Sequence, residues 1–508
     1  MDKSKERKNG VILSYFSIII NVLIQLLYTP FLLKMLGQNE YGLYSLISTI
    51  IGSLTVLDLG FGNAIVVYTV KYRAQKKYEE ERKLYGMFLI IFNIIGVLAA
   101  IIGIILFFNI DLIFGTSLNH FEINKAKIMM LILSLNLFIT FSFNIYSSII
   151  TAYEKFTFQK TLIIINSLLK PIIMIPLLFL GYKSITLCII ITIVNIITLF
   201  SNYIYCKNKL NINISFQGFD KKIFIEIMGY SFFIFLGVVV DKINWSVDQF
   251  ILGAISGTMA VSIYSIASQL NSLFINLSTA ISNVLLPKVS MMITQNTNNE
   301  ELTNEFIKVG RIQFLIIFLM ISDLVLFGKE FIITWAGNNY SEAYYIAIIL
   351  IIPMTIPLIQ NLGISIMQAK NLHKFRSTLY FFIAIFNIFI SIPLAKNFGG
   401  IGSALGTSIS LVIGSVIIIN IYYYKKIGLD IPRFWKNILK MGLFYLIPVI
   451  IIIIIMHFIT LNGYIYIIIF GTIYSIIYFI TNYFLVMNDY EKELVKKILK
   501  RFNITKVN

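Results

Sequence analysis

The sequence predicts an all-α membrane protein with about 14 transmembrane helices, built as two six-helix bundles around a central cavity plus two C-terminal helices. Of the 508 residues, 58% are hydrophobic and only 13% are charged, whereas a soluble protein carries about 25% charged residues. The apolar residues also come in long blocks, such as residues 11–33 and 441–461. Each block exceeds the ~20 residues that cross ~30 Å of hydrocarbon as a helix.

Charged, Gly- or Asn-containing segments separate these blocks, and they define fourteen predicted spans. The spans lie near residues 11–33, 41–70, 84–109, 126–150, 161–181, 185–206, 223–253, 259–287, 309–333, 343–367, 377–395, 401–424, 438–460 and 464–487. The basic N-terminal segment precedes an apolar run that is long and lacks a small-residue cleavage site, which predicts a retained first span.

The distribution of positive charge predicts that both termini lie in the cytoplasm. With that assignment, 33 of the 41 Lys and Arg residues fall on the cytoplasmic side and only 6 on the opposite side. This asymmetry is the positive-inside rule, so topology explains the net charge of +17 and no nucleic-acid partner is predicted. The two remaining cations, Lys170 and Lys242, fall near the middle of spans.

The second half of the chain repeats the first. Shifts of 220 and 217 residues superpose Gly37 on Gly257, Asn63 on Asn283, Ala126 on Ala343 and Pro176 on Pro393. Six spans per copy is an even number, so the copies share one orientation and are parallel repeats. The predicted domains are a first bundle, a second bundle, and two extra spans with a basic tail, at residues 1–210, 211–426 and 427–508.

Six ionisable side chains lie deep in predicted spans, where each costs ~2.5–3.5 kcal/mol on insertion scales. They are Asp58, Lys170, Asp241, Lys242, Asp248 and Asp323. Amide and indole side chains share helical faces with them or with each other, at spacings of three or four residues: Asn21, Gln25, Asn166, Asn244 and Trp245.

Two interpretations of these polar groups are open. They form internal ion pairs and interhelical hydrogen bonds of ~0.6–2 kcal/mol each, or they bind a substrate and a coupling ion. The first interpretation is favoured for the single amides. It also suits Asp58 and Asp248, which stand beside turn-like motifs. For Lys170 and Lys242 the second interpretation is favoured, because a lone lysine at mid-depth can hold an anionic substrate.

The sequence contains none of the common catalytic, cofactor or metal-binding patterns. Cys188 and Cys206 stand at opposite ends of one hairpin, and His120, His373 and His457 are scattered over unrelated segments. We therefore expect no catalytic residues, no cofactor and no metal, and a transporter rather than an enzyme.

Four short segments resemble a known family. LGQNEYGLY at residues 36–44 and LDLGFGN at residues 57–63 are similar to the opening of the Wzx-type polysaccharide flippases. DQFILG at residues 248–253 and IYSIA at residues 263–267 resemble the start of that family's second bundle. The family belongs to the MOP superfamily, with the MATE drug exporters and the lipid II flippases.

The resemblance implies translocation of an undecaprenyl-pyrophosphate-linked oligosaccharide from the inner to the outer leaflet of the bacterial cytoplasmic membrane. It implies a cationic central cavity, a role that would fall to Lys170 and Lys242, with Arg311 at the cytoplasmic mouth. Amide and aromatic side chains would meet the sugars, and Asp58, Asp241, Asp248 and Asp323 would couple H⁺ or Na⁺ or stabilise the structure. Membrane lipids and polysaccharide assembly proteins are further expected partners.

Three alternatives remain at this point. A MATE-like exporter would use the acids to bind organic cations, and a lipid II flippase would share most features of the first interpretation. A membrane glycosyltransferase or polymerase would carry a sizeable extramembrane catalytic loop, which the sequence lacks.

Overall fold

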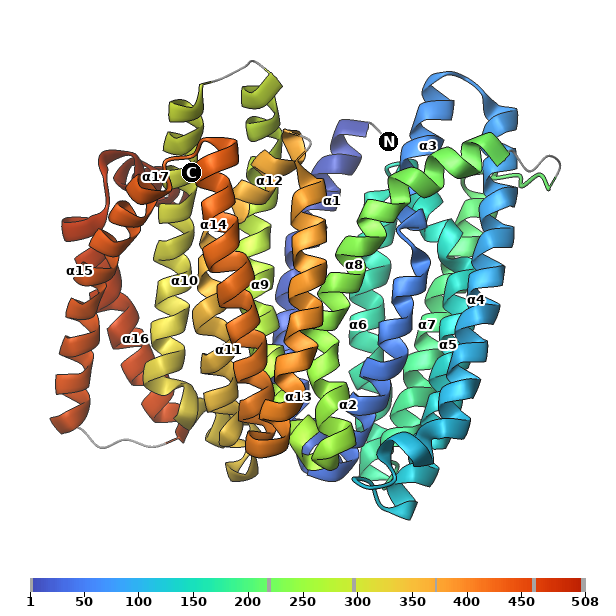
Figure 1. The fold of residues 1–508 in the computed structure, drawn as a ribbon, viewed down its shortest axis with the longest axis horizontal. Coiled ribbons are helices and arrows are strands. Elements are labelled where there is room, and N and C mark those ends of the chain that lie inside the picture. The colour runs from blue at the N-terminus through green and yellow to red at the C-terminus, as the bar shows by residue number, and fades with distance from the viewer. Residues whose placement is uncertain (1–2, 217–220, 295–297, 371, 459–462, 504–508) are drawn as a thin grey trace. The chain divides into compact units, whose positions relative to one another are not determined.

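The computed structural model describes residues 3–216, 221–294, 298–370, 372–458 and 463–503. Every regular element in these ranges is helical (Figure 1), which confirms the predicted fold class. The α-helices are α1 (Lys3–Leu36), α2 (Gln38–Ser53), α3 (Phe61–Ala74), α4 (Tyr78–Phe114), α5 (His120–Ala152), α6 (Phe156–Phe179), α7 (Ser184–Asn208), α8 (Lys221–Ile255), α9 (Gly257–Thr294), α10 (Asn299–Ala336), α11 (Glu342–Ile359), α12 (Asn361–Ala369), α13 (His373–Leu411), α14 (Ile419–Tyr422), α15 (Ile431–Phe458), α16 (Gly463–Thr481) and α17 (Asp489–Asn503).

Five short 3₁₀ or π segments complete or join these helices: η1 (Leu54–Asp58), η2 (Asn338–Tyr340), η3 (Val412–Ile418), η4 (Tyr423–Ile427) and η5 (Asn482–Val486). Within the described residues each predicted span falls largely on helix, and four spans comprise more than one element. The second predicted span comprises α2, η1 and α3, and the tenth comprises α11 and α12. The twelfth comprises the end of α13 with η3, α14 and part of η4, and the fourteenth comprises α16 and η5.

Within the described residues, 11 segments are long and apolar enough to cross a membrane. One of them, Phe375–Ile427, contains two predicted spans. It reverses at Gly399, whose backbone (φ 57°, ψ −134°) is not helical. The chain is therefore a multi-pass membrane protein, and the count of fourteen stays a prediction.

The chain forms two compact units. Unit 1 comprises residues 1–265 and 380–406, and unit 2 comprises residues 266–379 and 407–508. The division of the sequence at residues 210 and 426 stays a prediction about the repeat.

In unit 1 the helix α5 packs against both α4 and α7, and α1 packs along α6 (Figure 1). The helix α8 packs against α2 and α3. Large aromatic side chains fill the interior between α3 and α4, where Phe61 contacts Phe88 and Phe92 with ring centroids 5.7 and 6.5 Å apart.

In unit 2 the helix α10 packs against α11, α15 and α16. A stack of rings fills this interior: the rings of Phe318 and Tyr445 lie 4.7 Å apart, and those of Tyr445 and Tyr478 lie 5.1 Å apart. Aromatic packing of this kind adds ~0.5–1.5 kcal/mol per pair beyond the area buried.

The turns support the sequence repeat. Three positions with left-handed backbone in the first half have counterparts in the second half, at separations close to the two shifts found in the sequence. The pairs are Gly37 with Gly257 (φ 80° and 78°), Gly181 with Gly399 (φ 88° and 57°), and Asn211 with Gly428 (φ 51° and 80°). Left-handed backbone favours Gly or Asn, so both copies place such a residue where a helix must end.

Candidate functional site

The helices α2 and α9 meet in unit 1 at a very close backbone contact. A Cβ atom added to Gly42 would lie 1.9 Å from the carbonyl oxygen of Thr258. Only glycine permits this approach, because no side chain can occupy the space. The side chain of Thr258 continues the contact by donating a hydrogen bond of 2.8 Å to Glu122 of α5.

Hydroxyl and amide groups extend this contact along α2. Thr49 and Ser45 donate hydrogen bonds of 2.5 and 3.3 Å to the Oε1 atom of Gln249 on α8. The hydroxyl groups of Ser45 and Ser265 also form a hydrogen bond. We call the set Gly42, Ser45, Thr49, Gln249, Thr258 and Ser265 the α2–α9 contact.

Ser45 and Ser265 are 220 positions apart, which is one of the two shifts that define the predicted repeat. Two equivalent residues can touch each other only where they lie next to the axis that relates the two copies. The predicted repeat therefore implies that the α2–α9 contact lies beside the axis relating its two copies.

A buried group of oxygen atoms surrounds Asp248, which is 2% exposed. Its carboxylate accepts hydrogen bonds from the hydroxyl groups of Tyr264, at 2.5 Å, and Ser403, at 2.7 Å. Nearby, Ser391 donates to the amide oxygen of Asn387 at 2.8 Å, and its hydroxyl lies 3.5 Å from the carbonyl oxygen of Ser403. We call Asp248, Tyr264, Asn387, Ser391 and Ser403 the Asp248 cluster.

Asp58 stabilises the break in the second predicted span. Its carboxylate accepts a 3.0 Å hydrogen bond from the side chain of Asn144 and further bonds from the backbone N–H groups of Gly60 and Gly62. Because these N–H groups belong to the first turn of α3, the carboxylate satisfies donors that a helix start leaves unpaired. This geometry favours the structural interpretation of Asp58.

The two mid-span lysines form no ion pair with any residue that the structure describes. Lys170 on α6 and Lys242 on α8 are both half-buried. Neither has a hydrogen bond or ion pair to another group in the described part of the chain. The helices α6 and α8 are not among the pairs in extensive contact within those residues, so the structure does not join the two lysines into one cluster.

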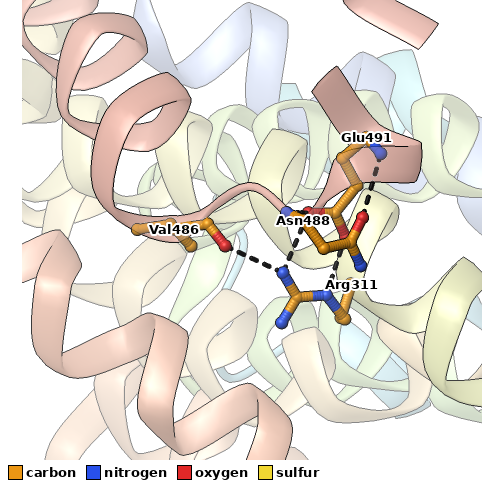
Figure 2. Close-up of polar contacts among 4 residues, drawn as sticks. All are labelled: Arg311, Val486, Asn488 and Glu491. Atoms are coloured by element: carbon orange, nitrogen blue, oxygen red, sulfur yellow. Dashed lines mark hydrogen bonds and ion pairs between the residues drawn. The ribbon is translucent and has the colours of Figure 1, made fainter. Parts of the chain in front are cut away.

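Arg311 is not open to a substrate in this structure, because α17 covers it (Figure 2). The side chain is 8% exposed and Glu491 is 4% exposed. The Nε and Nη2 atoms of Arg311 donate to the two carboxylate oxygens of Glu491 at 2.7 and 2.8 Å. The Nη2 atom also donates to the carbonyl oxygen of Val486 at 3.0 Å. Substrate binding by Arg311 stays a prediction, and this geometry favours a structural role.

The remaining predicted residues are distributed over both units. Asn21 donates to the carbonyl oxygen of Ser17, one turn earlier on α1, and Gln25 is half-buried. Asn166 donates a 2.8 Å hydrogen bond to Thr198, which fixes α6 against α7.

On α8, Asp241 is exposed, and Asn244 and Trp245 are half-buried. Asp323 on α10 has one buried carboxylate oxygen without a hydrogen-bond partner in the described residues.

An apolar hollow of about 540 Å³ lies between α1 and α6. Its lining includes Leu23, Leu27 and Phe31 from α1, and Leu168 and Pro171 from α6. The residue next to this lining on α6 is Lys170, so an apolar hollow and a lone cation occupy the same stretch of the helix.

The sequence did not predict that Gln249 and the small residues of α2 join helices through the α2–α9 contact. Gln249 is 7% exposed and accepts two hydroxyl donors. The signal was present, because Ser45 and Ser265 are matched positions of the repeat, but only the structure shows that matched positions touch.

The fold of this chain is the helical fold of two solved membrane transporters. One solved structure, an inward closed conformation of the lipid II flippase MurJ, superposes with a TM-score of 0.73 at 22% identity, covering 93% of this chain and 97% of that one. An inward-facing MATE multidrug transporter superposes with a TM-score of 0.65 at 14% identity, covering 80% of this chain and 96% of that one. At these identities the likeness shows the fold alone.

The sequence relationship is more specific. The family model described as polysaccharide biosynthesis protein matches residues 8–293, so the chain belongs to that family. A putative O-antigen transporter of Shigella flexneri is 21% identical over 81% of this chain and 96% of its own length. A probable flippase, AglR, of Haloferax volcanii is 26% identical over 34% of this chain and 37% of its own length.

Proposed function

We propose that the chain is a flippase for polysaccharide biosynthesis. It moves a polyprenyl-pyrophosphate-linked oligosaccharide from the inner to the outer leaflet of the bacterial cytoplasmic membrane. The observation that carries the proposal is membership of the polysaccharide biosynthesis family, together with the O-antigen transporter similarity over 96% of that relative's length. The MOP-type fold fits this activity, and both termini are placed in the cytoplasm by the positive-inside rule.

Lys170 and Lys242 hold the pyrophosphate in this proposal. Both lysines lack an internal partner in the described residues, and an unpaired ammonium group in a span is costly unless it contacts water or an anion. A charge-assisted hydrogen bond to a phosphate oxygen contributes ~1.5–3 kcal/mol. These lysines also favour an anionic lipid over the organic cations that a MATE-like exporter would carry. A lipid II flippase, the nearer alternative, differs in its sugar.

The α2–α9 contact is the outer gate in this proposal. By the same rule, the turns at Gly37 and Gly257 face the outside, so the contact would close, on that side, the central cavity expected from the sequence. Breaking it and closing the opposite end would exchange access between the leaflets. The Asp248 cluster, with its carboxylate among hydroxyl and amide oxygens, has ligands suited to Na⁺ or a proton and is the proposed coupling site.

A genetic experiment tests the proposal. Deleting the gene should trap lipid-linked oligosaccharide on the cytoplasmic leaflet and abolish surface polysaccharide. Complementation with Lys170→Ala or Lys242→Ala should restore less than about a tenth of the polysaccharide, because ~1.5–3 kcal/mol of phosphate binding is lost. Lys170→Arg should restore more than Lys170→Ala.

The exposed Lys209→Ala is the matched control and should complement fully, and all variants should be present at equal protein levels. Full complementation by both lysine variants and by their double variant would remove these residues from the proposal. Normal surface polysaccharide in the deletion strain would contradict the function itself.

A further inference from the structure

The helix α17 begins at a fixed position on unit 2. Asn488 and Glu491 cap its start reciprocally: the Asn488 side chain accepts from the Glu491 N–H, and Glu491 accepts from the Asn488 N–H, both at 2.9 Å. The same Glu491 pairs with Arg311 of α10 (Figure 2). In addition, the Nζ atom of Lys308 lies 3.6 Å from the centre of the Tyr490 ring. The first turn of α17 is therefore anchored to α10.

This anchor lies where the lipid-facing surface of the last spans ends. Phe484 and Leu485, just after α16, are 71% and 54% exposed, and the cap residue Asn488 follows three positions later. In a multi-pass membrane protein such exposed apolar side chains face the hydrocarbon. The chain therefore leaves the hydrocarbon shortly before α17 begins, which places α17 at the level of the lipid headgroups.

The composition of α17 is typical of a helix at the level of the lipid headgroups. Leu494 and Val495 are half-buried, whereas Lys496 and Lys497 are exposed. Lys497 is partly neutralised by a 2.8 Å ion pair with Glu493. An amphipathic helix with lysines on its polar face lies in the membrane interface.

The start of α15 presents a second group of cations at the same end of unit 2. The backbone N–H of Asp430 donates to the hydroxyl of Thr303, near the start of α10, and Arg311 lies eight residues further along that helix, about 12 Å. Arg433, Lys436 and Lys440 follow on α15. They share one helical face, because their spacing is three and four residues.

These three side chains are exposed and have no ion-pair partner within the described ranges. The apolar surface of α15 begins directly beside them, since Leu439 is 64% and Leu443 is 69% exposed. A stripe of unpaired cations at the edge of a lipid-facing surface is complementary to lipid phosphate groups.

We propose that Arg433, Lys436 and Lys440 of α15, with Lys492 and Lys496 of α17, form a binding surface for anionic phospholipid headgroups. We call these five residues the basic surface. The occupant is a bilayer lipid, not a soluble polyanion, because the adjoining leucines hold the cations at headgroup depth. The surface is separate from the proposed transport site and does not depend on the proposed function.

The test counts lipids that remain bound to the purified full chain. The protein is equilibrated with an equimolar mixture of phosphatidylglycerol and phosphatidylcholine in detergent, and bound lipid is measured by native mass spectrometry. The unchanged chain should retain phosphatidylglycerol in preference to phosphatidylcholine. Arg433→Gln/Lys436→Gln/Lys440→Gln should lower retained phosphatidylglycerol about tenfold or more, because each cation near an anionic lipid surface contributes favourably.

The control removes three other exposed cations, in Lys76→Gln/Lys77→Gln/Lys83→Gln. Lys76 and Lys77 lie in the turn before α4 and Lys83 lies in the second turn of that helix, all close in sequence to Glu79 and Glu80, so we expect no loss of phosphatidylglycerol. Lys436→Arg/Lys440→Arg keeps the charge and should retain the lipid, which separates loss of binding from loss of folding.

Equal phosphatidylglycerol retention by the unchanged chain and the Arg433→Gln/Lys436→Gln/Lys440→Gln variant would overturn the proposal. So would an equal loss in the control variant. Displacement of the bound lipid by millimolar inorganic phosphate would overturn the assignment to a lipid, whereas retention under that competition supports it.

Discussion

Substituting Gly42 by alanine should open the α2–α9 contact. The new Cβ atom would lie 1.9 Å from the Thr258 carbonyl oxygen and 3.1 Å from the Cβ atom of Ser262. A carbon and a carbonyl oxygen approach to ~3.3 Å at the closest, so the backbones must separate by about 1.4 Å. Overpacking of this kind costs ~1–3 kcal/mol. At ~1.4 kcal/mol per factor of ten, the closed arrangement should become about 5- to 150-fold less populated relative to the open one.

Cysteine cross-linking measures this population. The hydroxyl groups of Ser45 and Ser265 are hydrogen-bonded, so Ser45→Cys/Ser265→Cys should form a disulfide rapidly in mild oxidant. The native cysteines, Cys188 and Cys206, are buried and free and should contribute little. Adding Gly42→Ala to this pair should slow cross-linking at least about fivefold, the lower end of the shift expected from overpacking.

The control lies on the same helix. A Cβ atom added to Gly52 meets no atom within 4 Å, and Gly52→Ala gains the same helix propensity of ~0.5–1 kcal/mol. The difference between the two variants therefore isolates the contact with Thr258. Unchanged cross-linking in Gly42→Ala, or an equal slowing in Gly52→Ala, would show that the close approach of Gly42 to Thr258 does not hold the contact closed.

Three further substitutions test the fold and the site. Glu491→Gln should lower the free energy of unfolding by ~3–5 kcal/mol, because it leaves Arg311 buried without its partner; thermal unfolding should show this, and the exposed Glu493→Gln should leave the transition unchanged. Gly399→Ala should lower stability by ~1–3 kcal/mol, since φ 57° with ψ −134° is open almost only to glycine, and an unchanged unfolding midpoint would argue against the turn. Asp248→Ala should abolish transport, and Asp248→Asn should still fold but lose any dependence of transport on Na⁺ or pH. Uptake into vesicles with and without an imposed gradient measures this dependence. If transport by Asp248→Asn depends on the gradient as in the unchanged chain, Asp248 is not the coupling residue.

The arrangement of helices followed from simple physics. A chain in hydrocarbon must satisfy its backbone within each span, so apolar blocks such as residues 11–33 could only be helices, and α1 covers that block. The repeat was also legible, because Gly37 and Gly257 mark equivalent turns.

The site was less predictable, because depth in a span does not say which way a side chain points. Arg311 lies at a span end as expected, yet a residue 180 positions later pairs with it. Asp58 and Lys170 are both charged residues within apolar spans, but Asp58 accepts three hydrogen bonds and Lys170 has no partner in the described residues. Such long-range pairings depend on packing that no local pattern encodes.

Transbilayer movement of a lipid-linked anionic sugar measures the proposed activity directly. The purified chain is reconstituted into vesicles with a fluorescent polyprenyl-pyrophosphate oligosaccharide, and a membrane-impermeant reductant bleaches the outer leaflet. We expect bleaching to pass well beyond the half that is accessible in protein-free vesicles, and we expect Lys170→Ala/Lys242→Ala to return it to that half. Bleaching that stops at half with the unchanged chain, at every gradient tested, would show that the chain does not move this lipid.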